Sequence, residues 1–192
     1  MVFTRNPSGR REFYEILRGI TATRYVTRQL KIGKTKQLDR LAREAGEVYS
    51  QTVVAFWRIV RHKNHWLSSN AMQKIIHNGN LHSQTVQGII QAFYEALRSW
   101  EALRKNGMNA KPPRRLNRYY SIPFKSSAIA LKDGTLKLSI GKGIEPLCIP
   151  WRFARPKVCE ISYNGAGYVL NAVYTVANAS ITTEHGCAGI DL

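Results

Sequence analysis

The chain has 192 residues, with 29 lysines and arginines against 12 aspartates and glutamates, and a formal net charge of +17. Its hydrophobic content of 44% excludes a disordered basic tail, because such tails lack the apolar groups that offset chain entropy. No run approaches the roughly 18 apolar residues of a membrane span, and no signal-peptide segment follows the N-terminus. We therefore expect a folded cytoplasmic protein with a polyanionic partner, nucleic acid first and an anionic membrane surface second.

The basic residues are concentrated in two stretches that contain no acidic residue. One covers residues 16–38 and the other covers residues 102–132. Residues 158–192, by contrast, contain no lysine or arginine. Ordinary surfaces intersperse both signs of charge, so this distribution predicts a localised polyanion-binding surface rather than a uniformly solvated one.

The first elements predicted along the chain are a strand and two long helices. Alternating apolar residues predict a strand over Arg24–Ile32. Thr35 is placed to cap a helix that runs to about Arg61, and a second amphipathic helix is expected over Ser83–Lys105. A short helix is expected around residues 72–76. The two long helices are expected to pack as a hairpin or small bundle.

After the second helix the pattern becomes strand-like. Lys-Pro-Pro-Arg-Arg at residues 111–115 predicts an extended basic linker, because paired prolines cannot continue a helix. Closely spaced short strands then predict a small OB-like β-barrel, and the early strand is expected to pair with it. The predicted fold is therefore α+β, with helices inserted into a barrel. The later strands are expected at residues 128–131, 135–140 and 144–149 and at Val158–Tyr163 and Tyr168–Val176, with tight turns at Asp133-Gly134 and Asn164-Gly165.

Motifs for metal binding and for nucleophilic catalysis are incomplete. His62 and His65 are three residues apart, and His77 and His82 follow, but these residues do not supply four ligands at the spacing of a zinc site. The three cysteines form no CxxC pair. No GxSxG elbow and no P-loop is present, and the acidic residues are scattered. The sequence therefore contains no complete active site.

Two segments interleave arginines with aromatic residues. Guanidinium groups neutralise phosphates and flat rings stack on bases, so these segments favour contact with RNA or single-stranded DNA. The alternative is that Tyr119 and Phe153 are core residues of the barrel. The two segments are Arg114-Arg115-Leu116-Asn117-Arg118-Tyr119-Tyr120 and Trp151-Arg152-Phe153-Ala154-Arg155.

Residues 187–192, Cys-Ala-Gly-Ile-Asp-Leu, are typical of an apolar strand that carries one carboxylate, Asp191. In RNase H-like nucleases such a carboxylate holds one of two metal ions. That site needs at least two further acidic residues, which this chain does not supply. We therefore expect the chain to be a portion of a longer protein, with no metal bound within these residues.

Taken in order, these features resemble the N-terminal half of the transposon-encoded TnpB proteins and of their relatives, the type V CRISPR effectors. In that family the barrel is the wedge domain, the inserted helices are the recognition lobe, and the terminal strand opens the RuvC nuclease domain. The implied organisation is an N-terminal extension with the first wedge strand (1–33), a recognition lobe (34–110), a wedge barrel (111–184) and the start of RuvC (185–192). The matching segments are Arg24-Tyr25-Val26-Thr27-Arg28-Gln29-Leu30-Lys31, Lys36-Gln37-Leu38-Asp39-Arg40-Leu41, Val48-Tyr49-Ser50, Leu81-His82-Ser83-Gln84, Ala92-Phe93-Tyr94, Leu147-Cys148-Ile149-Pro150 and Gly189-Ile190-Asp191-Leu192.

The resemblance implies a prokaryotic protein that binds a guide RNA and target double-stranded DNA, and that reads a short motif beside the target. Asp191 would be the first metal-binding carboxylate of RuvC, with Mg2+ held only by the complete domain. The implied motif-reading residues are Ser83, Gln84, Gln87, Lys125 and Ser126, whose side chains suit contacts to base edges. The other residues expected to contact nucleic acid are Arg24, Arg28, Lys31, Lys34, Lys36, Arg114, Arg115, Arg118, Tyr119, Tyr120, Trp151, Arg152 and Arg155.

The sequence leaves alternatives open. Ser83 can also be an ordinary helix N-cap, with the neighbouring polar groups facing solvent. The whole protein can be a guided DNA-binding protein that has lost its nuclease acids. A third possibility is a free-standing RNA-binding module that acts in ribosome or RNA assembly.

Overall fold

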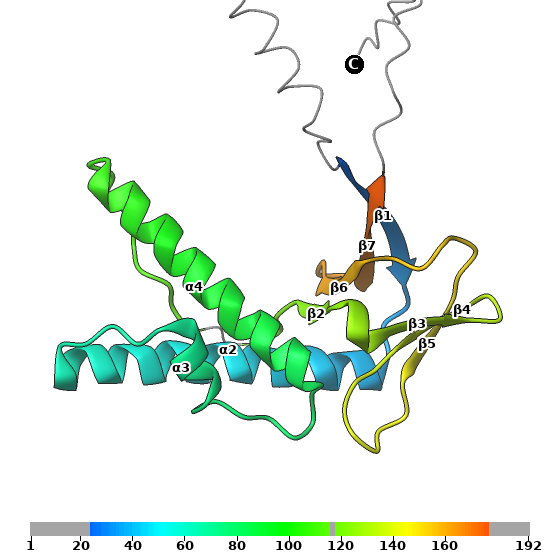
Figure 1. The fold of residues 1–192 in the computed structure, drawn as a ribbon, viewed down its shortest axis with the longest axis horizontal. Helices are drawn as coiled ribbons and strands as arrows, with labels where there is room; N and C mark the ends of the chain where they lie inside the picture. Colours follow the sequence, from blue (N-terminus) through cyan, green and yellow to red (C-terminus); the bar gives the residue numbers. More distant parts are fainter. Residues whose placement is uncertain (1–23, 116–117, 177–192) are drawn as a thin grey trace, which may run out of the picture. The chain divides into compact units, whose positions relative to one another are not determined.

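A computed structural model describes residues 24–115 and 118–176 as an α+β fold with two antiparallel sheets and a helical region (Figure 1). The helices and most of both sheets lie in one compact unit, Thr27–Tyr174. The N-terminal extension before residue 24 and the expected RuvC strand at 185–192, with Asp191, fall outside the described residues. The elements are β1 (Arg24–Ile32), α2 (Lys36–Lys63), α3 (Ser69–Gln73), α4 (Ser83–Lys105), β2 (Ile122–Phe124), a 3-10 turn η1 (Ser126–Ala128), β3 (Ile129–Lys132), β4 (Thr135–Leu138), β5 (Leu147–Pro150), β6 (Val158–Tyr163) and β7 (Tyr168–Val176).

The long helix α2 begins and ends at residues that suit its termini. Thr35 is its N-cap, as predicted, and its Oγ1 accepts the backbone N–H of Leu38 at 3.1 Å. Asn64 ends the helix in the left-handed conformation, with φ 46°. Between them one apolar stripe of the helix is buried, with Leu38, Leu41, Ala45, Val48 and Phe56 all 0% exposed, whereas Ile59, at the same helical spacing, is half-buried.

The helical core is centred on Phe56 of α2. Its ring lies 5.3 Å from that of Phe93 and 5.8 Å from that of Tyr94, both on α4, and 5.5 Å from that of Trp66. All three pairs are edge-to-face, the geometry that aromatic rings prefer. The buried face of α4 ends at Leu97, and Leu103, which its spacing assigns to that face, is 40% exposed.

The four-stranded sheet has the order β1-β7-β6-β2, and the three-stranded sheet has the order β3-β4-β5 (Figure 1). The early strand β1 joins the later strands, as predicted, and its neighbour is β7, the last described strand; the helices are inserted between two strands of one sheet. Within residues 24–115 and 118–176 no hydrogen-bonded ladder joins the two sheets, so the strands do not form a closed barrel. The coarse prediction, α+β with inserted helices, is confirmed.

Both predicted tight turns are present. Asp133 and Gly134 have φ values of 49° and 68°, so the β3–β4 hairpin closes with the left-handed pair that a two-residue connection requires. In the β6–β7 connection the Asn164 side chain accepts the backbone N–H groups of Ala166 and Gly167, at 3.2 and 2.9 Å. These turns fix the strand registers that position the loops discussed below.

Gly46 lets the linker between the helices and the sheets lie directly on α2. A side chain at this position would overlap the backbone carbonyl of Arg118. Next to it, the backbone N–H of Tyr120 donates to the carbonyl of Ala42 at 3.0 Å. The linker is therefore held against α2 by a close backbone approach that only glycine permits.

We expect Gly46→Ala to destabilise the protein. Alanine gains up to about 1 kcal/mol over glycine in an exposed helix, but forcing an extra methyl group into a packed contact costs about 1–3 kcal/mol. The overlap with Arg118 therefore outweighs the helix propensity, and urea denaturation should give a lower unfolding midpoint.

Gly79→Ala is the matched control, because nothing lies within 4 Å of the added carbon and its φ is not left-handed. It should leave the midpoint unchanged or slightly raised. A Gly46→Ala protein as stable as the wild type would contradict the close packing of the linker.

Candidate nucleic-acid interface

The start of α4 and the segment 123–127 lie side by side, although they are far apart in the sequence. The hydroxyl of Thr85 donates to the carbonyl of Pro123 at 2.9 Å, and the hydroxyl of Ser127 donates to Oε1 of Gln84. Lys125 Nζ donates to Oε1 of Gln91 at 2.9 Å. We call these two segments together the α4–loop surface. It consists of Ser83, Gln84, Gln87, Gln91, Lys125, Ser126 and Ser127.

The α4–loop surface brings together both sets of residues that the resemblance implies for motif reading. Ser83 is exposed, and Gln84, Gln87 and Lys125 are half-buried. The N-cap of α4 is His82, whose Nδ1 accepts the backbone N–H of Gln84 at 3.2 Å. The alternative interpretation of Ser83 as the N-cap of α4 is therefore wrong, because His82 caps the helix and the Ser83 hydroxyl does not.

A groove of about 530 Å³ borders this surface. Lys125, Ser126 and Lys157 line it together with the carboxylates of Glu95 and Glu160. The groove therefore offers cationic groups beside acids, a mixture that suits recognition of polar edges better than that of bare phosphates.

The basic linker lies along α2. Arg114 and Arg115 are exposed and line a cavity of about 560 Å³ with Trp57 and Arg61 of α2. Arg61 also donates from Nε to the carbonyl of Trp57 at 3.2 Å. Arg118, just after the two undescribed residues, is exposed as well. Three of the predicted phosphate-binding arginines therefore remain accessible.

The two tyrosines of the linker are packed rather than free. The ring of Tyr120 stacks on that of Tyr49, with centroids 4.6 Å apart, and burial raises the pKa of Tyr120 to about 12. The ring of Tyr119 lies 4.9 Å from that of Tyr163, edge to face. Both side chains are half-buried, which favours the core interpretation over base stacking for this pair.

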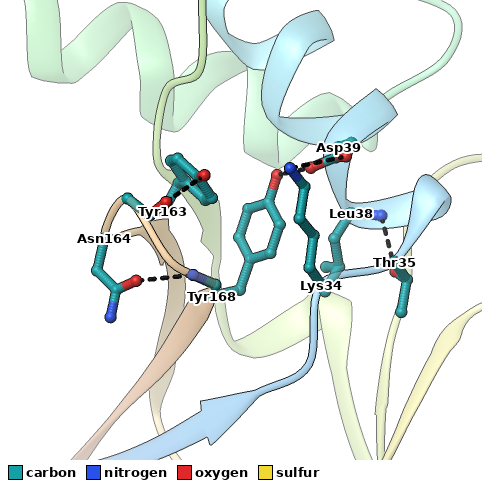
Figure 2. A network of polar contacts seen from close by, with 9 residues as sticks. Lys34, Thr35, Leu38, Asp39, Tyr163, Asn164 and Tyr168 are labelled. Carbon is teal, nitrogen blue, oxygen red and sulfur yellow. Dashed lines mark hydrogen bonds and ion pairs between the residues drawn. The ribbon is translucent and has the colours of Figure 1, made fainter.

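Figure 2 shows how Lys34 is engaged at the start of α2. Its Nζ lies 3.8 Å from Oδ2 of Asp39 and 5.6 Å from the ring centre of Tyr163. Asp39 also accepts the hydroxyl of Tyr168 at 2.8 Å (Figure 2). Burial, together with this hydrogen bond to the carboxylate, raises the pKa of Tyr168. The cluster ties α2 to the β6–β7 hairpin, so part of the Lys34 charge is neutralised within the protein.

The remaining basic residues of this end of the chain are more accessible. Arg28 and Lys31 on β1 and Lys36 at the start of α2 are all exposed. Arg24 begins β1, but its side chain is outside the description. Arg28 and Lys31 therefore place exposed positive charge on β1, which lies at the edge of the four-stranded sheet.

The segment Trp151–Arg155 divides into structural and accessible residues. Trp151 is 5% exposed and donates from Nε1 to the carbonyl of Ala154 at 3.1 Å. Arg155 donates to the carbonyls of Ile129 at 3.1 Å and Ser126 at 2.6 Å. Its guanidinium therefore holds the loop at Ser126 in place, although Arg155 is exposed, as is Arg152, which forms no such bond among the described residues.

Sequence reasoning missed Gln91, Ser127 and Arg61. Gln91 lies one helical turn after Gln87, so the spacing of the glutamines on α4 was a usable signal. Nothing in the local sequence marks Ser127, which joins the surface only through the fold of η1.

Among residues 24–115 and 118–176, no three metal-ligating side chains come together. In that same part of the chain, no helix has the length and apolar character needed to cross a bilayer. Comparison with protein-family models and with curated proteins finds no match to this chain.

Proposed function

We propose that this chain is the guide-RNA- and target-DNA-binding portion of an RNA-guided DNA endonuclease of the TnpB or type V CRISPR type. In this proposal the two sheets belong to an OB-like wedge domain, and α2, α3 and α4 form the recognition lobe. Asp191 would be the first carboxylate of a RuvC site that holds Mg2+ only when the rest of that domain is present.

The observation that carries the proposal is the α4–loop surface. The resemblance assigns motif reading to two segments with no relation in sequence, and Gln84–Ser127 and Gln91–Lys125 hydrogen bonds join those segments. The Ser127 hydroxyl donates a hydrogen bond to the side-chain oxygen of Gln84, so the side-chain nitrogen of Gln84, Nε2, has no partner among the described residues. A glutamine amide can bond the edge of adenine, and a lysine can donate to guanine.

Charge supports the same proposal. The net charge is +17, and predicted phosphate-binding arginines on β1 (Arg28) and on the linker (Arg114, Arg115 and Arg118) are exposed, together with further arginines on α2 and α4. In an RNA-guided system, base pairing with the guide reads the target sequence. The protein contacts the nucleic-acid backbone and reads only a short adjoining motif. A basic surface beside a small polar reading surface fits that division of labour.

The test is a selection from duplex DNA with a randomised segment, using the purified chain with the RNA that co-purifies with it. We expect the wild type to enrich a short motif. Gln84→Ala and Lys125→Ala should each relax one position of it by about 5- to 150-fold, because a lost base contact is worth about 1–3 kcal/mol. Affinity for the RNA should not change.

Gln51→Ala is the matched control, since Gln51 is exposed on α2 and lies outside the α4–loop surface. It should enrich the same motif as the wild type. If the wild type retains RNA but enriches no motif, the target-reading proposal fails, and the free-standing RNA-binding alternative is favoured.

A further inference from the structure

A pocket of about 590 Å³ lies between β1 and the segment that follows β5. It is separate from the α4–loop surface and shares no lining residue with the groove beside that surface. Arg28 and Gln29 line it from β1, and Trp151, Arg152 and Phe153 line it from the other side. Its volume is in the range of pockets that hold a small ligand.

Two guanidinium groups meet at the ring of Phe153. The guanidinium carbon of Arg28 lies 4.4 Å from the ring centre, and that of Arg152 lies 5.3 Å from it. Both distances are within the reach of a cation–π contact. One arginine comes from the first strand and the other from the second half of the chain, so only the fold brings them together.

The ring that both arginines contact is held in place. The backbone N–H of Trp151 donates to the carbonyl of Gly134 at 2.7 Å, and the Trp151 ring packs edge-to-face on Phe153 with centroids 5.5 Å apart. Arg155 anchors the far end of the segment on Ile129 and Ser126. Phe153 is therefore a preorganised platform rather than a loop side chain free to swing.

Within residues 24–115 and 118–176, no acidic side chain pairs with the charge on this platform. Arg28 and Arg152 are exposed, and neither forms a hydrogen bond or an ion pair with a residue in the described part of the chain. Two like charges held around one ring repel each other, and an anion between them removes that repulsion. The pocket therefore has the electrostatics of an anion site.

We propose that this pocket binds one unpaired nucleotide of the nucleic acid that the chain holds. The base stacks on the guanidinium planes that Phe153 supports, and the phosphate accepts hydrogen bonds from Arg28 and Arg152. The amide of Gln29 lies in the same pocket and offers a donor and an acceptor to a base edge. The proposal rests on the proposed function and names a single-stranded subsite within it.

The test uses three fluorescein-labelled strands with equal numbers of phosphates. They are a ten-residue adenosine RNA, a ten-residue deoxyadenosine DNA and a ten-residue abasic strand. Fluorescence anisotropy should show Phe153→Leu and Arg152→Lys each binding the adenosine strands about 5- to 100-fold more weakly than the wild type. Binding of the abasic strand should change much less, because both substitutions keep the charge that contacts phosphate and the abasic strand has no base to lose. Tighter binding of the RNA than of the DNA points to the guide as the source of the nucleotide, and the reverse points to a DNA strand.

Arg98→Lys on α4 is the control for arginine geometry, because Arg98 is exposed and lies outside this pocket. It should bind all three strands as the wild type does. Because Arg152 is exposed, Arg152→Lys tests the pocket even if Phe153→Leu fails to fold.

Wild-type affinity of Arg152→Lys and Phe153→Leu for the adenosine strands would overturn the nucleotide pocket and leave the motif selection untouched. Conversely, the motif selection can fail while both variants bind the adenosine strands more weakly by the predicted factors. That result would overturn the proposed function and support the nucleotide pocket.

Discussion

Replacing Phe56 with alanine is expected to destabilise the protein by about 3–5 kcal/mol, since truncating a fully buried phenylalanine costs that much. The ring is 0% exposed and makes four edge-to-face contacts that disappear together, with Trp57, Trp66, Phe93 and Tyr94. α2 and α4 meet there, so the truncation opens a cavity between the two helices. Differential scanning calorimetry should show the melting temperature falling by about 10 °C.

Ile75→Ala is the control for losing an apolar side chain without opening a cavity. Ile75 is 52% exposed, and its truncation should change the unfolding free energy by less than about 0.5 kcal/mol. Phe56→Leu, which keeps part of the volume, should lie between the two. A loss below about 1 kcal/mol for Phe56→Ala would mean that the aromatic cluster is not the centre of the helical core.

The second large effect concerns salt. The affinity of the chain for a 20-base-pair RNA hairpin should fall about 1,000-fold between 50 and 200 mM NaCl, because each neutralised phosphate releases bound counterions. Six of the exposed residues predicted to bind phosphate lie on β1, at the first residue of α2 and on the linker, and contacts from these six alone correspond to a slope of about −5 in a plot of log affinity against log salt. They are Arg28, Lys31, Lys36, Arg114, Arg115 and Arg118.

The Arg114→Ala/Arg115→Ala double variant should reduce that slope by about 2, one for each lost phosphate contact. Lys74→Ala/Lys142→Ala removes the same charge from exposed positions outside the predicted interface and should leave the slope nearly unchanged. Fluorescence anisotropy over a salt series gives all three slopes. A flat dependence in the wild type would exclude the basic surface as the binding site.

The sequence was most informative where local chemistry decides the structure. The strand periods predicted β1, β6 and β7 with the bounds that the structure has, and Thr35 marked the start of α2. The prediction of a small β-barrel was less successful, because the described strands form two separate sheets. The pairing of distant strands depends on contacts that no local pattern encodes. Periodicity alone could not tell that β3, β4 and β5 would form their own sheet.

The candidate site divides in the same way. The basic stretches and the interleaving of arginines with aromatic residues predicted Arg28, Arg114, Arg115 and Arg152 as nucleic-acid contacts, and all four are exposed. Composition could not show that Arg28 and Arg152 share the ring of Phe153, since they lie in distant segments. Nor could it distinguish the packed ring of Tyr120 from a free one, because that difference depends on the partner ring of Tyr49.

The strand order has a consequence for biosynthesis. Asp39 and its partner Tyr168 are separated by 129 residues. At the usual rate of translation, Tyr168 is therefore synthesised roughly ten seconds after Asp39. During that interval β1 has emerged without the strand that pairs with it, while the helical region, residues 36–105, already contains the aromatic partners of Phe56. Lysine and arginine on an unpaired strand discourage it from pairing with other chains. We therefore expect the inserted helices to fold first on the ribosome, and the sheet into which they are inserted to close last.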